Sequence, residues 1–443
     1  MHIFSRQKGN YHHTVLACYI GYLTQALVIN FSPLLFVTFM RQYTLSLSQV
    51  STLIAVSFTT QLIVDFLASR YVEKIGYRTA VVGAHVFAVL GMIGLALLPE
   101  WLPSPMLGLV IATAMGSIGG GLIEVMISPL LEACPTDEKS GSMSLLHSFY
   151  SWGQAGTILL STLFFAVVGI EHWRLLACLW AILPAFGALA FLFVPIYRLQ
   201  PSEEAQTVTP KKERQLLLLF FALMICAGAA EQVMSQWAST FAESALGIDK
   251  TLGDLLGPCM FAVLMGISRV FYGKFSEKIR LERFMLCSCL LCILSYLLAA
   301  FSPSPIFSLT GCALCGMSVG ILWPGTYSQA ARRMPHISMA TYALLAFGGD
   351  IGCLAGPSIA GEIAEWFDGN LRAAFLFALI FPVVSILIFF VIGKRHAEPK
   401  ATTSSGTASS PASDDGASRE QIDDDSPAPE TSATETERGD SHT

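Results

Sequence analysis

The stretch SRYVEKIGYR, residues 69–78, occurs a second time in altered form as GKFSEKIRLE, residues 273–282. The second copy begins 204 residues after the first, aligns with it without gaps and shares its Glu-Lys-Ile. Both stretches are short charged segments that directly follow a long apolar run. A charged segment repeated at the same place behind an apolar run indicates a duplicated unit.

Two further pairs of segments support the duplication. GSIGGGLIEVMISPLLEACP, residues 116–135, and GMSVGILWPGTYSQAARRMP, residues 316–335, share five residues at an offset of 200. A Gly-x-x-Gly pair that begins at Gly153 recurs at Gly349, an offset of 196. Three matches in the same order at nearly one offset predict a tandem repeat.

The composition indicates that the repeated unit is built from membrane helices. The 443 residues are 53% hydrophobic and only 13% charged, whereas soluble domains carry about 25% charged residues. Apolar runs of about 20 residues recur, each long enough to cross a bilayer, and they are continuous rather than alternating, which argues against a strand-built barrel. We therefore predict an all-α polytopic membrane protein. Its twelve expected spans are 14–40, 48–70, 79–99, 105–132, 142–168, 174–196, 215–244, 254–275, 284–301, 306–331, 338–364 and 371–393.

Lysine and arginine positions predict the orientation of these spans. Nineteen of them lie near span ends on the side that carries both termini, whereas the other side receives only Arg41, Arg174, Lys250 and Arg372. Because loops rich in Lys and Arg stay in the cytoplasm, we expect both termini to be cytoplasmic, in the plasma (inner) membrane.

The longest polar insert before the tail separates two halves of six spans. We expect a cytoplasmic N-terminus (1–13), a six-helix bundle (14–197), a cytoplasmic linker (198–214), a second six-helix bundle (215–395) and a disordered acidic cytoplasmic tail (396–443). The last 43 residues hold ten acidic and two basic residues, which accounts for the net charge of −6. Six spans per unit give both copies the same orientation, and parallel repeats are one of the known transporter plans.

No cofactor or metal is expected. The eleven cysteines fall mostly in apolar runs, and CSCLLC and CALC lack histidine partners, so we interpret them as small apolar helix residues. GSIGGG is not followed by Gly-Lys-Ser/Thr and is not a phosphate loop. With no nucleotide motif, the expected driving force is a proton gradient.

The repeated charged segment resembles the hallmark loop of the major facilitator superfamily, Gly-x-x-x-Asp-basic-x-Gly-basic-basic. The first copy matches it at Glu73, Lys74, Gly76 and Arg78, with Ser69 in place of the first glycine. The resemblance covers residues 1–396 and implies two parallel-repeat six-helix bundles, the major facilitator fold.

The second copy matches at Gly273, Glu277 and Lys278, with Arg280 in place of the second glycine. We assign a gating role to the charges of both copies. Asp65 and Arg269, equivalent at the offset of 204 near the ends of spans two and eight, are expected to be gate or packing charges as well.

Within the superfamily the chain looks most like the fucose:proton symporter (sugar permease) branch. Span four carries Glu124, where that branch has a glutamate involved in proton coupling, so the resemblance implies this role here. Ser128 replaces the asparagine that follows it, and span one has Gln25 and Asn30 in place of an acid.

Polar residues inside the spans point to a common face. A charge at the centre of a spanning helix costs about 2.5–3.5 kcal/mol and persists where it faces protein or water. In span seven Glu231, Ser235, Ser239 and Glu243 are spaced by four and form one stripe. With Asp350 in span eleven, we predict Glu124, Glu231 and Asp350 as proton-coupling residues; the alternative is a structural carboxylate bonded to a neighbouring helix.

Polar and aromatic residues on the same faces are the candidate substrate contacts. Trp and Tyr rings can stack on a sugar face, although helix or lipid packing is the alternative. The candidates are Gln25, Ser128, Trp152, Gln154, Ser235, Gln236, Trp237, Trp323 and Tyr327.

These observations together predict a secondary active transporter of a small polar, sugar-like solute, coupled to protons by symport and working by alternating access. The alternative is proton-antiport efflux of small organic compounds. The expected partners are solute, proton and lipid bilayer, with no nucleic acid, and the chain is expected to be a monomer. An intramembrane enzyme is disfavoured, because FGGD (347–350) and GMSVG depart from the protease motifs and no His-Glu-x-x-His occurs; a non-transporting sensor is a third reading.

Overall fold

The computed structural model describes residues 11–135, 139–197, 211–275, 279–334 and 339–396. These residues contain helices and no strand, and twelve helical segments are long and apolar enough to span a membrane. The all-α fold and the twelve predicted spans are thereby confirmed. The described residues belong to one compact unit that runs from residue 1 to 397.

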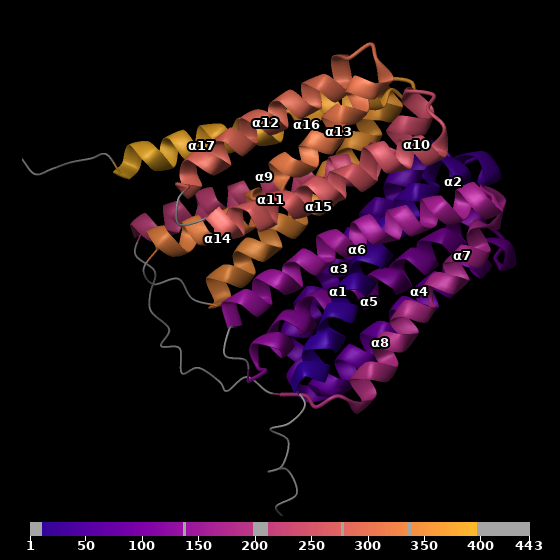
Figure 1. Ribbon diagram of the computed structural model, residues 1–443, viewed down its shortest axis with the longest axis horizontal. Coiled ribbons are helices and arrows are strands. Elements are labelled where there is room, and N and C mark those ends of the chain that lie inside the picture. Colours follow the sequence, from indigo (N-terminus) through magenta and orange to yellow (C-terminus); the bar gives the residue numbers. More distant parts are fainter. Residues whose placement is uncertain (1–10, 136–138, 198–210, 276–278, 335–338, 397–443) are drawn as a thin grey trace, which may run out of the picture. The chain divides into compact units, whose positions relative to one another are not determined.

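The first six spans form the group α1 to α8, called the first half below (Figure 1). Spans one and six are each built from two helices. The helices are α1 (Tyr11–Phe31), α2 (Phe36–Tyr43), α3 (Leu47–Ile75), α4 (Tyr77–Trp101), α5 (Pro105–Glu132), α6 (Lys139–Val168), α7 (Trp173–Trp180) and α8 (Ile182–Phe193).

The last six spans form the group α9 to α17, the second half. Spans eight, ten and twelve are each built from two helices. The helices are α9 (Lys211–Thr240), α10 (Lys250–Asp254), α11 (Met260–Phe275), α12 (Leu281–Phe301), α13 (Pro305–Val319), α14 (Leu322–Arg333), α15 (Met339–Trp366), α16 (Leu371–Ala378) and α17 (Ile380–His396).

Several spans that meet between the halves are interrupted helices. A 3-10 turn at Ser32–Leu35, which contains Pro33, separates α1 from α2. A π-helical turn, Leu255–Cys259, contains Pro258 and separates α10 from α11. Proline removes a backbone donor and bends a helix, which accounts for the interruption of the α-helix at both places.

Glycines bring helices within each half into backbone contact. A Cβ on Gly91 of α4 would lie 2.4 Å from Cα of Gly116 on α5. In the second half, a Cβ on Gly228 of α9 would lie 2.2 Å from the carbonyl oxygen of Gly349 on α15. Only glycine permits such approaches, as in other membrane helix pairs. The position of α15, which carries Asp350, is therefore fixed by α9, which carries Glu231.

The largest buried apolar cluster crosses from one half to the other. It includes Phe36, Phe39 and Trp173 from the first half and Trp237 and Phe241 from the second. The rings of Phe36 and Trp237 have centroids 5.7 Å apart. These residues belong to the span ends opposite the two termini, so the halves are packed against each other on that side, called the closed side below.

Candidate functional site

A cavity of about 390 Å³ lies between the two halves. This volume falls within the range of small-molecule sites. Residues from spans one, two, four, five, seven, eight, ten and eleven line this central cavity: Tyr22, Gln25, Ile29, Phe58, Gln61, Glu124, His147, Ser148, Tyr150, Glu231, Gln232, Arg269, Tyr272, Gly273, Ile321, Trp323, Pro324, Tyr327, Ser328, Asp350 and Cys353. All three carboxylates predicted for proton coupling are therefore brought to one cavity.

Glu124 is held by span one. Its Oε2 atom accepts a hydrogen bond of 2.7 Å from Nε2 of Gln25. One turn further along α5, the hydroxyl groups of Ser128 and Tyr22 are 2.9 Å apart and share a hydrogen bond. Gln25 thus lines the cavity as predicted, whereas Ser128 reaches it only through Tyr22.

Glu231 is paired with an arginine from span eight. Nη2 of Arg269 lies 3.5 Å from Oε2 of Glu231, and Nη1 donates a hydrogen bond of 2.9 Å to the hydroxyl of Ser151 in the first half. Nε donates to the carbonyl oxygen of Gly320, at 3.2 Å. One guanidinium group therefore connects the carboxylate of α9, the helix break of span ten and the opposite half.

Arg269 lies near the end of span eight, where the sequence places it, and it also lines the central cavity. Arg269 lies six residues before the end of α11, about 9 Å along the helix axis, and its side chain points into the central cavity. Because charged residues inside a membrane tend to pair with one another, the sequence could have suggested that Arg269 pairs with Glu231.

Asp350, Trp323 and Tyr327 complete the wall formed by the second half. Trp323 and Tyr327 are one turn apart on α14, and both line the cavity. The Trp323 ring lies over Gly349, where a Cβ would be 2.2 Å from a ring carbon. The absence of a side chain at Gly349 therefore leaves the space that the Trp323 indole occupies.

The charges of the cavity wall do not balance. Three carboxyl groups, those of Glu124, Glu231 and Asp350, face the cavity, and Arg269 supplies the single Lys or Arg side chain among the described lining residues. Burying unpaired carboxylates is costly. A wall with surplus carboxyl groups therefore favours the uptake of a cation or of protons.

Three of the predicted substrate contacts are turned to other partners. Gln154 donates a hydrogen bond of 2.9 Å to Ser235, and Ser235 donates one of 3.3 Å to Asn30, which joins the halves through buried side chains. Trp237 is fully buried, and its indole donates to the carbonyl oxygen of Pro357 at 2.9 Å. None of these three predicted residues lines the central cavity, because the closed side covers this part of the stripe.

Gln236 and Trp152 also lie outside the central cavity. The Gln236 amide donates to Oε1 of Gln232 at 3.2 Å and lines a separate, smaller space of about 30 Å³. The Trp152 side chain is 43% exposed, and its ring lies over Gly266 of the second half, where a Cβ would be 3.5 Å from it. Neither residue is part of the lining of the central cavity in this conformation.

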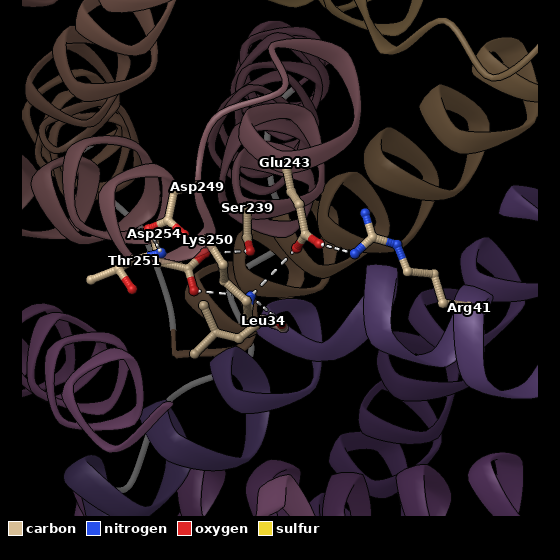
Figure 2. Close-up of polar contacts among 8 residues, drawn as sticks. All are labelled: Leu34, Arg41, Ser239, Glu243, Asp249, Lys250, Thr251 and Asp254. Carbon is tan, nitrogen blue, oxygen red and sulfur yellow. Dashed lines mark hydrogen bonds and ion pairs between the residues drawn. The ribbon is translucent and has the colours of Figure 1, made fainter. Parts of the chain in front are cut away.

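The closed side is held by a charged network between the halves (Figure 2). Lys250 lies between Asp254, at 3.0 Å, and Glu243, at 3.9 Å, and also donates a hydrogen bond to the carbonyl oxygen of Leu34 in the first half. Nη1 of Arg41 lies 2.9 Å from Oε1 of Glu243 and makes a second link across the halves.

Helix α3 of the first half is joined to α15 beside this network. The hydroxyl of Ser48 donates a hydrogen bond of 2.6 Å to Glu362, and the backbone N–H of Leu47 donates one of 3.1 Å to Glu365. The two carboxylates thus bind the first turn of α3, where free N–H groups and the helix dipole favour negative charge.

The charged loop residues that we assigned to gating do not share one location in the structure. Arg78 donates to the carbonyl oxygens of Phe191 and Val194, both at 2.8 Å, so it caps the end of α8 within the first half. The Lys74 ammonium lies 5.6 Å from the centre of the Tyr71 ring. Glu277, Lys278 and the side chain of Glu73 lie outside the described residues.

Asp65 is half-buried on α3 and does not line the central cavity. Its Oδ1 atom has no hydrogen-bond partner among the described residues. One turn earlier on α3, Gln61 does line the cavity, and the sequence prediction missed it. The spacing of four between the two polar residues within an apolar run was the available signal.

Ser328 was also missed. It lines the cavity and is the counterpart of Ser128 at the offset of 200. Tyr150 and Tyr272 line the cavity too and were not among the predicted contacts.

The fold and the site define a twelve-span transporter with a central cavity. Comparison with known families identifies it: residues 18–341 and 246–421 match the Major Facilitator Superfamily, and the chain belongs to this family. The "Multi-drug resistance efflux pump PmrA homolog" of Lactococcus lactis subsp. lactis (strain IL1403) is 23% identical over 351 residues, 75% of this chain and 82% of that protein. "Membrane protein MosC" of Rhizobium meliloti is 24% identical over 272 residues, 61% of this chain and 65% of that protein.

Solved transporter structures share the fold. A bacterial homolog to the human lysosomal transporter Spinster, in an inward-facing and occupied conformation, superposes with a TM-score of 0.67 at 14% identity and covers 88% of this chain and 98% of its own. The nucleoside transporter NupG superposes with a TM-score of 0.65 at 14% identity and covers 86% of this chain and 99% of its own. At these identities the likeness concerns the fold alone.

Proposed function

We propose that this superfamily member is a proton-coupled symporter of a small polar, sugar-like organic solute and works by alternating access. The observation that carries the proposal is the central cavity of about 390 Å³, which combines surplus carboxyl groups with amide, hydroxyl and aromatic side chains. The branch of sugar permeases remains a prediction from the sequence.

The chemistry of the wall favours a polar solute. Gln25, Gln61 and Gln232 offer amide donors and acceptors, and tyrosine hydroxyl groups add both kinds of partner. The Trp323 ring offers a flat apolar face for the C–H side of a ring-shaped solute. An apolar compound would leave these polar groups without hydrogen-bond partners, which costs binding free energy.

The carboxyl groups supply the coupling. Glu124 is bonded to neutral Gln25, whereas Glu231 has the Arg269 guanidinium beside it. A carboxylate in a closed cavity without a cationic partner is stabilised by a proton. Glu124 and Asp350 are therefore the groups that carry protons, and Glu231 carries one when Arg269 turns to the solute.

Alternating access requires that one end of the cavity open while the other closes. The network around Lys250 and Glu243 holds the closed side. Toward the termini the cavity reaches Tyr272 and Gly273, close to the end of α11. With cytoplasmic termini, as the loop charges predict, this conformation is the one that faces inward.

Transport assays in proteoliposomes test the proposal. A panel of radiolabelled monosaccharides, nucleosides and amino acids is offered with and without an imposed inward proton gradient. We expect one class to accumulate with the gradient, and Glu124→Gln and Glu231→Gln to abolish accumulation while the protein still inserts. Glu132→Gln, at the end of α5 outside the cavity wall, is the matched control. Normal accumulation by both cavity variants would refute proton coupling through these residues.

The second candidate is proton-antiport efflux. The printed name of the Lactococcus relative, a multidrug efflux pump homolog, favours it, and the same carboxyl groups would serve. The direction of the gradient distinguishes the two: an antiporter accumulates substrate when protons leave the vesicle lumen, a symporter when they enter it.

A further inference from the structure

A second cavity, of about 590 Å³, lies in the second half at the span ends that face the termini. It is bounded by α9, α12, α14 and α17, outside the central cavity. Four arginines line one end: Arg280, Arg283, Arg332 and Arg333. We call this space the arginine pocket.

Among the residues that the structure describes, the charge in the arginine pocket is mostly uncompensated. One lining carboxylate, that of Glu282, lies 2.9 Å from Nη2 of Arg333 and 3.6 Å from Nη2 of Arg280. Arg283 and Arg332 are exposed at the rim. Four guanidinium groups facing one carboxylate leave a strong site for an anion.

A buried amide at the base of the pocket also lacks a partner. Gln329 is 2% exposed and lines the pocket. Its Oε1 accepts a hydrogen bond of 3.2 Å from Nε of Arg333, but its Nε2 has no hydrogen-bond partner among the described residues. Buried donors are rarely left unsatisfied, so this amide is available to donate to a group bound in the pocket.

The arginines are not required by the repeated scaffold. At the offsets of 204 and 200, the first half has Gly76 and Thr79 in place of Arg280 and Arg283, and Glu132 and Ala133 in place of Arg332 and Arg333. The first half builds the same helix ends without any of these charges. The cluster is therefore a feature of the second half alone and calls for a separate explanation.

The other end of the pocket is apolar and opens between spans. Phe220, Leu286, Phe389 and Phe390 line it, and Phe390 is 58% exposed. These residues lie in membrane-spanning segments, so the exposed Phe390 ring is expected to meet lipid. A free inorganic anion makes no favourable contact with an apolar wall, whereas a molecule with a charged head group and hydrocarbon chains can contact both ends of the pocket.

We propose that the arginine pocket binds the phosphate group of an anionic phospholipid, with its acyl chains along Phe389, Phe390 and Leu286. Guanidinium groups bind phosphate through paired, charge-assisted hydrogen bonds. Basic pockets between membrane helices are suited to anionic head groups. Gln329 supplies a neutral donor to the same phosphate.

Thermal unfolding of the full chain in detergent tests the proposal. Phosphatidylglycerol is added in increasing amounts, in parallel with phosphatidylcholine and with inorganic phosphate. A ligand that binds the folded state raises Tm with concentration. We expect a saturable rise with phosphatidylglycerol only, half-maximal at a concentration at least fivefold higher in the double variant Arg283→Ala, Arg332→Ala.

A matched double variant controls for net charge. Arg70→Ala with Arg214→Ala removes two exposed basic residues outside the pocket, and we expect it to respond like the natural chain. If the alanine variant does not fold, Arg283→Gln with Arg332→Gln carries the same test. An equal loss of response in the Arg70 and Arg214 control would overturn the proposal, since charge alone would then explain binding.

Two further outcomes would also overturn it. A response to inorganic phosphate equal to that of phosphatidylglycerol would define a free-anion site. A response to phosphatidylglycerol that appears only after removal of residues 401–443 would mean that the acidic tail of the chain itself fills the pocket.

Discussion

Replacing Lys250 with Met removes a connection that exists only while the closed side is shut. Its ammonium group is 3.0 Å from Asp254, within the same half, and donates to the Leu34 carbonyl oxygen across the halves. When the closed side opens, the contact with Asp254 persists and the bond to Leu34 is lost. Only the cross-half bond therefore biases the equilibrium between the two conformations.

The size of this bias follows from the kind of bond. A hydrogen bond to a charged group contributes about 1.5–3 kcal/mol, and each 1.4 kcal/mol changes a population ratio tenfold. Lys250→Met should thus raise the population ratio of the conformation with the closed side opened to the conformation described here by about ten- to a hundredfold. Arg41→Ala should raise it about fivefold at most, because the Arg41 side chain is 71% exposed and surface pairs contribute about 1 kcal/mol or less.

Spin-label distances across the closed side measure this ratio. Ser104 and Ser244 are exposed on opposite halves, and each is replaced by a labelled cysteine after the exposed Cys178 and Cys287 are changed to serine. A longer-distance population should grow in Lys250→Met and remain unchanged in Lys274→Met, at the other end of span eight. Because Met leaves the buried Asp254 unpaired, Lys250→Met with Asp254→Asn serves as a second variant and should show the same shift.

Two results would refute the reasoning. The first is an unchanged distance distribution in both Lys250 variants. The second is a shift in Arg41→Ala as large as that in Lys250→Met, which would mean that burial does not decide the strength of these links.

Three more predictions concern the cavity and the first half. Gly349→Ala places a Cβ against the Trp323 ring and should lower stability by about 1–3 kcal/mol, the usual cost of overpacking, as measured by thermal unfolding; Gly83→Ala, where a Cβ meets nothing within 4 Å, should not lower it. Arg78→Ala uncaps α8 and should lower stability by about 1–3 kcal/mol in thermal unfolding, with the KM for solute unaltered. Arg269→Met leaves Glu231 unpaired and should lower stability more than Arg269→Met with Glu231→Gln does; strictly additive effects in this double-mutant cycle would show that the pair does not interact.

Most of the fold was predictable because it depends on local properties of the sequence. Each span is a run of apolar residues, and the repeated loop and glycines place the spans in order. Helical periodicity also gave the correct face for Glu124, Glu231 and Asp350, since a polar group inside a bilayer has to face protein or water.

The position of a residue along a shared face was not predictable in the same way. Glu231 and Trp237 both lie in span seven, but Glu231 reaches the cavity and Trp237 is covered by Phe36 of the other half. Periodicity fixes the direction of a side chain and says nothing of the surface opposite it. For the same reason Ser235 and Gln154 bind each other, although each was a reasonable candidate for a solute contact.

The glycine contacts between α9 and α15 have a mechanical consequence. At Gly228 and Gly349 the two helices meet backbone to backbone, which leaves little room for one to shift against the other at this contact. A solute that displaces Trp323 or Asp350 should therefore move α9 and α15 together. Helix α15 also carries Glu362 near its other end, where this carboxylate accepts the hydrogen bond from Ser48. Solute binding in the central cavity and the contacts that hold the closed side are then expected to be coupled through α15.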